Sequence, residues 1–527
     1  MHKRLYNHIK TLLFPCLAFS VVAGFLSAVI ITVFKILAEN VIHLSNTLYG
    51  AVRTNPIYLP LLILGAVSVG LVASLVLTHS RSCRGGGIPT SVAAIRGIVS
   101  FRWYASIFVL PFSALLTFLC GLPLGTEGPC VQMGTAVGNG VITCLGSKKH
   151  KGWRRYIMTG GASAGFSVAT SSPIAAIIFS MEELHKKFSP ILLTVVSLSV
   201  ISAQVTTQIF ASIGIGSVGL FEIPEIAAIS PKIFFAPLLV GIVCGLGSIL
   251  FTRLYHCIDK IMHAILKKLP VKVVIPLLFA CVSVIGYFLS DSLGTGHTLT
   301  DRVFRAEITW YGLILLFLIR AVLMIVSNTS GATGGIFLPT IAFGALLGGL
   351  CAEAMIALGL VGAEHYILMV VLGISAFLGA TSRIPITACV FAVESLGGTN
   401  NVLSVIIATI VALLVVESSG LEDFTDSVIK AKVRSISKGK EPTVIEVPLT
   451  VNRASFAVGK ELQDILWPTS CVVISVKHTV DNHETIGISE GDVITVRYKT
   501  YNPVATAEEF ECLVGVQSEH IKSLMNP

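Results

Sequence analysis

Three short glycine-rich segments of this chain have the residue types that bind a small anion through the polypeptide backbone. They are Gly85–Pro89, Gly125–Pro129 and Gly334–Pro339, and an apolar, helix-forming run follows each of them. Glycine lets the backbone turn sharply, and proline is tolerated in the first turn of a helix. Each segment therefore predicts a helix N-terminus, where free N–H groups and about half a positive charge attract anions. If the three ends converge, they form a site for one small anion.

These segments contain almost no lysine or arginine, so an anion there would be bound by partial charges of the backbone. Partial charges hold an ion firmly enough to remove its water and loosely enough to release it, which suits transport. A single glycine-rich break could equally serve helix packing or a kink, but three related breaks favour a site. The chain has no His/Asp/Glu spacing typical of a metal site and no Ser/His pattern typical of a hydrolase. We therefore expect no enzymatic activity, no catalytic residue, no metal and no catalytic cofactor.

Glu127 is the one acid inside these segments. Acids within a membrane are costly, and they are usually functional. An ionised carboxylate at this helix end could occupy the place of the anion, and a protonated one could swing away. Glu127 would then be a gate and a proton carrier together. The alternative is that it only caps the N-terminus of its helix.

The overall composition indicates a membrane protein with many spans. Of the 527 residues, 54% belong to the hydrophobic set and only 13% are charged, with a mean hydropathy of +0.84. Soluble domains usually have about 25% charged residues. The composition excludes a disordered protein, a coiled coil and a nucleic-acid-binding protein, and it argues against a soluble enzyme. What remains is an all-α polytopic membrane protein.

Long apolar stretches alternate with apolar segments of about 10–15 residues that glycine and proline interrupt. The short segments cannot span about 30 Å of hydrocarbon. Broken helices leave unpaired backbone groups, which a membrane tolerates only where they are buried in protein or line a polar cavity. The glycine-rich breaks are therefore the expected place of the substrate. The long stretches are residues 11–37, 57–78, 105–122, 189–213, 232–252, 273–289, 311–326, 364–380 and 402–417.

The chain contains an internal repeat whose offset increases slowly from 209 to 212 residues. Such a drift over about 100 residues implies two homologous halves, roughly 11–215 and 230–420. Transporters built from such halves place the substrate near the middle of the membrane, on discontinuous helices. One sequence leaves open whether the repeat is parallel or inverted. The matched pairs include Gly85 and Gly294, Gly125 and Gly335, Gly134 and Gly344, Pro173 and Pro385, and Glu182 and Glu394.

Two further acids, Glu182 and Glu183, end an apolar run that begins at Pro173. Glu182 has a repeat partner, so we interpret it as mainly structural. Glu183 has none, because Ser395 is at the matching position. It is a candidate second proton station near the cytoplasmic end of its helix. The alternative is an ordinary solvated helix end beside His185, Lys186 and Lys187.

The charge is distributed unevenly along the chain. Of the last 98 residues 23 are charged, but only 43 of the first 429 are. This contrast predicts a transport domain at 1–429, a basic linker at 430–442 and a soluble domain at 443–527. By the positive-inside rule the linker places the soluble domain in the cytoplasm, although it could also be simply solvated. The linker's basic residues are Lys430, Lys432, Arg434, Lys438 and Lys440.

Residues 10–435 resemble the CLC family of chloride channels and proton-coupled chloride transporters. Gly85–Pro89 is similar to the family motif G-S-G-I-P, Gly125–Pro129 to G-[KR]-E-G-P, and Gly335–Pro339 to G-x-F-x-P. The resemblance implies an inverted repeat of about 17–18 helices. It also implies a homodimer with one pore per subunit, in contact through segments like 173–210 and 384–417.

The resemblance also implies roles for individual residues. Ile336 and Phe337 stand where backbone amides of the family hold the central anion, and Glu127 at its external gate. Glu183 stands at the internal proton glutamate that exchangers have and most channels lack. The remaining residues that the resemblance places at the anion are Gly85, Gly86, Gly87, Gly128 and Thr425.

Three positions depart from the family pattern. Gly86 replaces the central serine, so a hydroxyl donor to the anion is lost. Thr126 replaces the basic residue before the gate, which lowers the local positive potential. Thr425 stands where the pore tyrosine is expected. Members with a changed serine position can prefer nitrate or fluoride, but glycine is not the methionine or asparagine of fluoride exporters.

The function that the resemblance favours is exchange of chloride for protons by a multi-pass protein of the plasma membrane. It depends on the presence of both Glu127 and Glu183. A passive, voltage-independent chloride channel is the alternative, which the changes at Gly86 and Thr425 favour. An exchanger that prefers nitrate or fluoride is a variant of the first. The expected partners are a second copy of the chain, membrane lipid and a small anion, with no nucleic acid.

Residues 443–515 read as a small α/β domain, with strands at 443–449, 471–477 and 492–498 and helices at 460–467 and 505–514. The phrases at 459–466 and 487–496 resemble the TrkA-C (RCK-C) domain, a regulatory module that tends to dimerise. In other transporters such domains bind small regulators, including cyclic di-AMP. The resemblance thus implies a regulatory nucleotide here. The alternative is a dimerisation or stability domain without a ligand.

Overall fold

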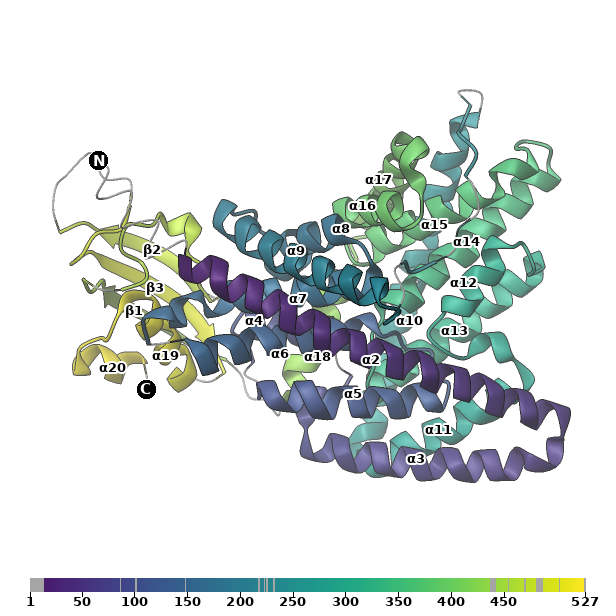
Figure 1. The fold of residues 1–527 in the computed structure, drawn as a ribbon, viewed down its shortest axis with the longest axis horizontal. Coiled ribbons are helices and arrows are strands. Elements are labelled where there is room, and N and C mark those ends of the chain that lie inside the picture. Colours follow the sequence, from purple (N-terminus) through teal and green to yellow (C-terminus); the bar gives the residue numbers. More distant parts are fainter. Residues whose placement is uncertain are drawn as a thin grey trace.

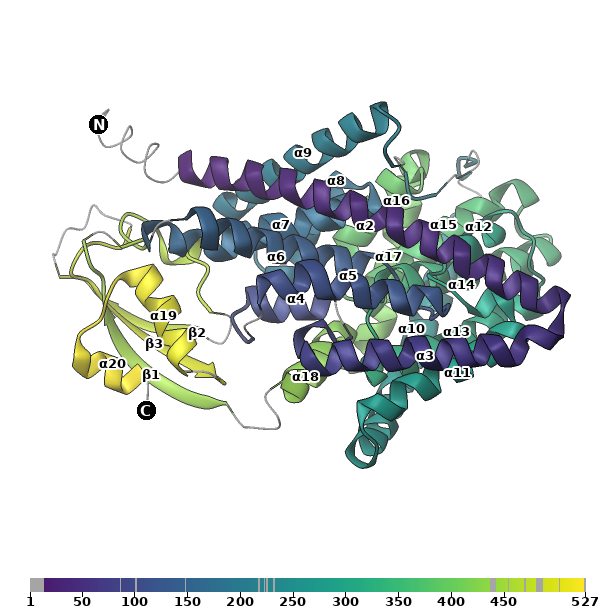
Figure 2. The same cartoon turned by 60° about the horizontal axis from the view of Figure 1, so that its bottom comes forward.

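The computed structural model has a helical body of α-helices α2 to α18, followed by a small sheet domain at one end (Figure 1). The long helix α2 runs along most of the body, as a second view shows (Figure 2). The structure describes residues 14–525, except 86, 100–101, 147, 217–218, 222, 224–225, 231–232, 437–441, 454, 469–470, 480–486 and 502.

The first half of the body begins with the 41-residue helix α2 and continues with shorter helices. Its helices are α2 (Phe14–Thr54), α3 (Leu59–His79), α4 (Ile88–Ile95), α5 (Trp103–Leu119), α6 (Glu127–Leu145), α7 (Arg154–Thr170), α8 (Pro173–Phe179) and α9 (Pro190–Ser212).

The second half repeats this order, and its helices from α12 onward start 207 to 212 residues after their counterparts from α4 onward. The predicted internal repeat is therefore confirmed. The second half comprises α10 (Phe235–Lys268), α11 (Val271–Phe288), α12 (His297–Phe304), α13 (Trp310–Ser330), α14 (Phe337–Ala357), α15 (Tyr366–Thr381), α16 (Pro385–Ser395) and α17 (Val402–Ser418). The helix α18 (Phe424–Ile436) follows both halves and includes the start of the expected linker.

The two halves run in opposite directions, which answers the question that the sequence leaves open. Gly125 and Gly335, which are equivalent in the repeat, form an antiparallel bridge. The N–H of each donates to the carbonyl oxygen of the other at 2.7 Å. Equivalent residues can pair in this reciprocal, antiparallel way only if a two-fold axis relates their segments. The repeat is therefore inverted.

A second reciprocal contact joins the halves through the paired acids of the repeat. The carboxylate of Glu394 accepts hydrogen bonds from the first backbone N–H groups of α8, at Ile174 and Ala175, both at 3.0 Å. The carboxylate of Glu182 accepts the equivalent bonds from α16, at Ile386 (3.1 Å) and Thr387 (2.8 Å). Each acid thus neutralises the positive end of the other half's helix. This contact confirms the structural interpretation of Glu182.

Within the described residues, nine helices are long and apolar enough to cross a membrane, namely α2, α3, α9, α10, α11, α13, α14, α15 and α17. Eight of them match the expected apolar stretches. The stretch at 105–122 forms α5, which has only 17 residues and is shorter than the others. The ninth, α14, was not expected as a long span, because glycines divide its sequence.

The helices behind the glycine-rich breaks pack backbone against backbone. A Cβ atom on Gly134 of α6 would lie 2.0 Å from the carbonyl oxygen of Gly161 in α7. In the second half, a Cβ atom on Gly344 of α14 would lie 2.6 Å from the carbonyl oxygen of Gly373 in α15. Small residues allow such close approach of helices within a membrane, where dispersion replaces the hydrophobic effect. Glycine is therefore required at these positions.

The C-terminal domain is a three-stranded antiparallel sheet in the order β1-β3-β2, with β1 at Thr443–Thr450, β2 at Cys471–Lys477 and β3 at Val493–Thr500. The helix α19 (Pro503–Val514) packs on it, with the ring of Phe510 4.9 Å from that of Tyr498. A short helix, α20 (Glu519–Met525), was not predicted. The expected helix at 460–467 is wrong, because only a single 3₁₀ turn forms there, at Leu462–Asp464.

We predict that Gly134→Ala lowers the melting temperature of the purified protein, because the added methyl group would collide with the carbonyl oxygen of Gly161. Overpacking of this kind costs typically about 1–3 kcal/mol. Gly65→Ala in α3 is the matched control, because no heavy atom lies within 4 Å of the added Cβ. Thermal unfolding in detergent measures both variants. If Gly134→Ala melts like the unmodified protein, the close packing of α6 on α7 is wrong.

Candidate functional site

The three glycine-rich segments meet at one place in the fold, as the sequence predicts. A Cβ atom on Gly87, which caps α4, would lie 2.6 Å from the Cα of Gly128 in the first turn of α6. A Cβ atom on Gly128 would lie 2.6 Å from the Cα of Gly335, just before α14. Only glycine backbones can approach so closely. The positive ends of α4, α6 and α14 are therefore gathered within one small region.

Gly85 and Gly87 shape the turn before α4. Both adopt positive φ angles, +60° and +97°, which favour glycine. The N–H of Gly87 donates to the Gln132 side chain at 2.8 Å, and that of Gly85 donates to the carbonyl oxygen of Gly331 at 3.0 Å. These bonds tie the turn to both halves of the repeat. Gly86, the third predicted glycine, lies outside the described residues.

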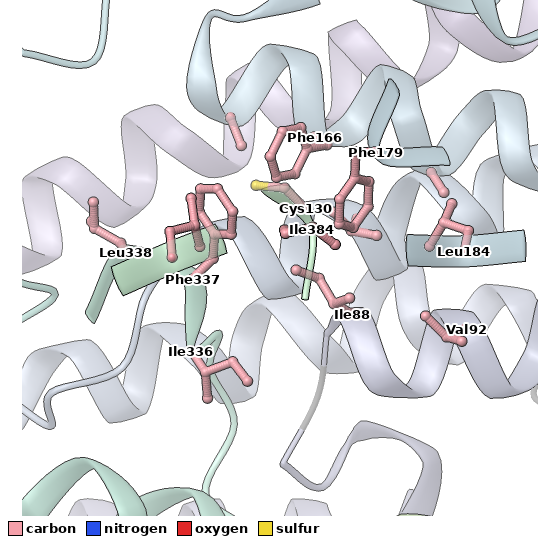
Figure 3. Packing of buried hydrophobic residues seen from close by; sticks show 14 of the residues in the cluster. Ile88, Val92, Cys130, Phe166, Phe179, Leu184, Ile336, Phe337, Leu338 and Ile384 are labelled. Atoms are coloured by element: carbon pink, nitrogen blue, oxygen red, sulfur yellow. The ribbon is translucent and has the colours of Figure 1, made fainter. Parts of the chain in front are cut away.

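Ile336 and Phe337 form the beginning of α14, with Ile336 as the N-cap. Both are buried. The ring of Phe337 packs edge-on against Phe166 at 4.9 Å, and Phe166 stacks on Phe179 at 4.5 Å. Figure 3 shows these rings and Ile88 around the end of α14. The backbone N–H groups at this helix end thus lie in an apolar shell, which strengthens their attraction for a negative charge.

The side chain of Glu127 is fully buried at this meeting point. Its Oε1 accepts a hydrogen bond from the hydroxyl of Thr126 at 3.1 Å. The carboxylate also interacts with the backbone N–H of Leu338 in the first turn of α14, and with the charge of Lys35. The Oε2 atom has no hydrogen-bond partner among the described residues. An acid of the first half therefore reaches toward the helix end of the second half.

Glu183 lies in a single π-helical turn, Ser180–His185, that continues α8. Its side chain is only 2% exposed, so the alternative of a solvated helix end is wrong. Arg96 holds the turn, because its guanidinium donates to the carbonyl oxygens of Glu183 at 2.9 Å and Leu184 at 3.0 Å. The Oε2 atom of Glu183 has no hydrogen-bond partner in the described part of the chain.

A cluster of charges closes over this turn from α18. Lys186 forms ion pairs with Asp423 at 3.0 Å and Asp426 at 2.9 Å. Arg96 reaches Asp426 at 3.7 Å. Opposite charges of this kind offset the cost of burying polar groups near Glu183. The loop and the first turn of α18 are thereby fastened to the turn that carries the acid.

Thr425 is buried in the first turn of α18, where Asp423 caps the helix by accepting from the Thr425 N–H at 2.9 Å. Its hydroxyl lies beside the carboxyl group of Glu183. The structure therefore brings Thr425 to the predicted proton station. α18 itself packs against α4.

A cavity of about 320 Å³ lies on another side of α18 and reaches Gly85 and Pro89. Tyr255 of α10 forms part of its wall, and its ring packs edge-on against Phe424 at 4.8 Å. The cavity is rich in cationic side chains, with one acid, Asp259. Its cationic wall residues are Arg84, Lys267, Lys432 and Arg434. An anion would be attracted into this cavity and brought next to the glycine-rich turn before α4.

Sequence reasoning missed Tyr255 and Arg84 as wall residues of this cavity. Tyr255 is 170 residues before Thr425 in the chain, so only the packing of α10 against α18 brings it to the site. The sequence could have indicated Arg84 as an anion-attracting residue, because it directly precedes the first glycine-rich segment. The N-terminal end of a helix and an adjacent arginine both favour anions.

Comparison with known proteins agrees with this arrangement. Residues 69–417 match the family of voltage gated chloride channels. The H(+)/Cl(-) exchange transporter ClcA of Vibrio parahaemolyticus is 28% identical over 368 residues, which cover 69% of this chain and 78% of that protein. The protein of the same name from Vibrio campbellii is 27% identical over the same lengths.

Two solved structures have the same fold. One is a slow cyanobacterial Cl⁻/H⁺ antiporter, with a TM-score of 0.71 and 21% identity, over 79% of this chain and 98% of that one. The other is a CLC-type fluoride/proton antiporter, with a TM-score of 0.63 and 22% identity, over 77% and 96%. Together with the apolar helices, these matches indicate a multi-pass membrane protein. Because the family match extends over more than half of the chain, the protein belongs to the voltage-gated chloride channel family, the CLC family.

Proposed function

We propose that this protein exchanges chloride for protons across the membrane, with Glu127 as external gate and Glu183 as internal proton station. One observation carries the proposal. Both acids are fully or almost fully buried, one where the helix ends meet and the other in the turn beside α18. A passive conductor of anions has no use for a second buried acid. The H(+)/Cl(-) exchange named for the curated relatives supports the same reading.

The anion in this proposal is held by the backbone at the helix ends. Ile336 and Phe337 supply N–H groups from α14. Gly85 to Gly87 and Gly128 let the positive ends of α4 and α6 come close to the anion, although the N–H groups of Gly85 and Gly87 themselves donate to Gly331 and Gln132. Partial charges of this kind bind a small halide without trapping it. Thr425 would contribute less to anion binding than the sequence indicates, because its hydroxyl lies beside Glu183.

The gate works by competition between a carboxylate and an anion for the same positive helix end. When ionised, Glu127 is attracted to the first turn of α14, where it already interacts with the Leu338 N–H. Once protonated, it loses most of that attraction, because a neutral group gains little from the helix dipole. An anion can then take its place, and the proton leaves toward the other side. Each exchange of occupants therefore couples the movement of the anion to that of a proton.

In this proposal the protein lies in the plasma membrane as a homodimer, with residues 443–527 in the cytoplasm as a TrkA-C-like regulatory domain. The transport domain would end at 429 and a basic linker would cover 430–442. Exposed apolar side chains on the segments 173–210 and 384–417 support a dimer contact there, among them Ile201, Ile209, Leu403 and Leu414. A membrane lipid would cover whatever part of this face the partner leaves open.

Two alternatives stay open under this proposal. A passive chloride channel is favoured by the threonine at 425, and a different small anion by the glycine at 86. Reversal potentials in liposomes with chloride, nitrate and fluoride at two pH values separate these cases. A potential that is indifferent to pH identifies a channel. A potential that shifts with pH identifies an exchanger, and its size for each anion ranks the substrates.

Under a chloride gradient, liposomes with the unmodified protein should take up protons, and Glu127→Gln should abolish this uptake while chloride flux continues. The amide keeps the shape of the side chain but carries no titratable proton. Paired recordings with a chloride electrode and a pH electrode measure both fluxes. The absence of proton uptake in the unmodified protein would refute the exchange mechanism.

Glu183→Val should abolish proton flux and leave chloride flux in place, because the acid lies in a buried turn away from the meeting helix ends. The same two electrodes test this variant. Glu490→Gln is the matched control, because Glu490 is an exposed acid of the C-terminal domain. Normal proton flux in Glu183→Val would remove this residue from the proton path.

We also propose that the C-terminal domain binds a regulatory nucleotide such as cyclic di-AMP. Support comes from the likeness of 459–466 and 487–496 to TrkA-C domains, which bind such ligands in other transporters. A ligand that binds only the folded protein raises its melting temperature. Titration of the full-length protein with cyclic di-AMP should therefore shift its thermal unfolding upward. No shift and no heat of binding would end this proposal.

A further inference from the structure

We propose that the C-terminal domain positions the internal acid, because its segment Gln463–Leu466 braces the turn that carries Glu183. This inference rests on the proposed function, in which Glu183 carries protons. The domain lies at the end of the helical body where the 3₁₀ turn Lys148–Trp153 leads into α7 (Figures 1 and 2). It contacts the first half of the repeat close to the π-helical turn Ser180–His185.

Three side chains of the helical body bind the backbone of this segment directly. Lys187 donates to the carbonyl oxygen of Gln463. The hydroxyl of Tyr156 donates to the carbonyl oxygen of Asp464 and accepts from the N–H of Leu466 at 3.2 Å. Arg155 donates to the carbonyl oxygen of Leu466 at 3.1 Å. The end of the 3₁₀ turn Leu462–Asp464 and the extended residues that follow it are thus held by the helical body.

Two of these contacts lead to the turn around Glu183. Lys187 is the second residue after the turn, and its N–H closes it by donating to the carbonyl oxygen of Met181 at 3.0 Å. From α7, Thr159 hydrogen-bonds the His185 ring at 2.8 Å and donates to the carbonyl oxygen of Arg155 at 2.7 Å. The C-terminal segment therefore holds the end of the turn both directly and through α7.

The opposite side of the turn is held by Arg96, which binds the carbonyl oxygens of Glu183 and Leu184. The turn lies between this arginine and the C-terminal segment. π-Helical turns are rare and occur mostly as single turns, often at functional sites. A change of this turn to α-helix would rotate the side chains that it carries. A rotation would move the Glu183 carboxyl group away from Thr425 and α18. Besides Arg96, the charged groups that act on this carboxyl are Asp423 and Lys186.

The contact between the domain and the body is buried, so it is a fixed part of the fold. Phe456 packs edge-on against Trp153 at 4.9 Å and covers Gly152, where a Cβ atom would lie 2.5 Å from its ring. Arg155 also forms an ion pair with Glu509 of α19. Tyr156 is fully buried there. If the domain shifts, buried contacts of this kind move the turn with it.

The test uses the full-length double variant Tyr156→Phe with Lys187→Met, which removes the hydroxyl and ammonium donors and keeps the side-chain bulk. Proteoliposomes give chloride flux and the ratio of proton to chloride flux. We expect the ratio of proton to chloride flux to fall about fivefold, the effect of losing roughly one net hydrogen bond, while chloride flux persists.

Two controls accompany this test. Lys187→Arg retains a donor and should restore the ratio when combined with Tyr156→Phe. Tyr501→Phe is the matched control, because Tyr501 is exposed on the same domain.

A second measurement separates this inference from the exchange mechanism. Hydrogen–deuterium exchange of residues 180–187 should become faster in the double variant than in the unmodified protein and in Tyr501→Phe. If exchange there is unchanged, the bracing role is wrong. If exchange rises but the unmodified protein moves no protons, the domain does hold the turn and the proposed function is wrong. An unchanged flux ratio in a proton-moving double variant overturns the link to Glu183.

Discussion

The mutual contact of the backbones at Gly87, Gly128 and Gly335 is the constraint on which the rest of the structure depends. Each of these glycines precedes or begins a helix, and a side chain on any of them would separate the helix ends. Because the ends meet without side chains, the positive ends of α4, α6 and α14 lie within one small region. The helices behind them must then also approach closely, which accounts for the backbone contact between α6 and α7 and between α14 and α15. The same arrangement recurs in the inverted half, which the reciprocal bridge at Gly125 and Gly335 joins to the first half.

A binding region made of helix ends has consequences for the few charged side chains nearby. A full positive charge would bind an anion too tightly, and the segments themselves have none. The acid that reaches the region, Glu127, is held by the hydroxyl of Thr126. Glu183 is held differently, because its turn is fixed by cations that bind backbone oxygens and by the ion pairs of Lys186. The two acids therefore have separate surroundings, and a change at one need not disturb the other.

The repeat, the three helix ends and eight of the nine long spans could be predicted from the sequence, because each depends on local patterns of glycine, proline and apolar residues. Burial of Glu183 and the position of Thr425 beside it could not, since both depend on α18 folding back over the first half. The helix expected at 460–467 failed for a related reason. Local helix propensity is real there, but Lys187 and Tyr156, more than 270 residues earlier in the chain, bind the carbonyl oxygen of Gln463 and the N–H of Leu466, which a helix would use.

The two halves have the same fold but differ in their functional residues. The contacts of the C-terminal domain reflect that difference. In the first half, Arg155, Tyr156 and Lys187 donate to the C-terminal segment. The equivalent residues of the second half are Ile367, Leu368 and Thr399, which have neither the charges nor the phenol. Glu183 shows the same asymmetry, because the equivalent position of the second half is Ser395. An inverted repeat alone would present equivalent turns to both sides of the membrane. The added donors and the added acid both lie in the first half, so the side that the domain braces is also the side that carries the extra buried acid.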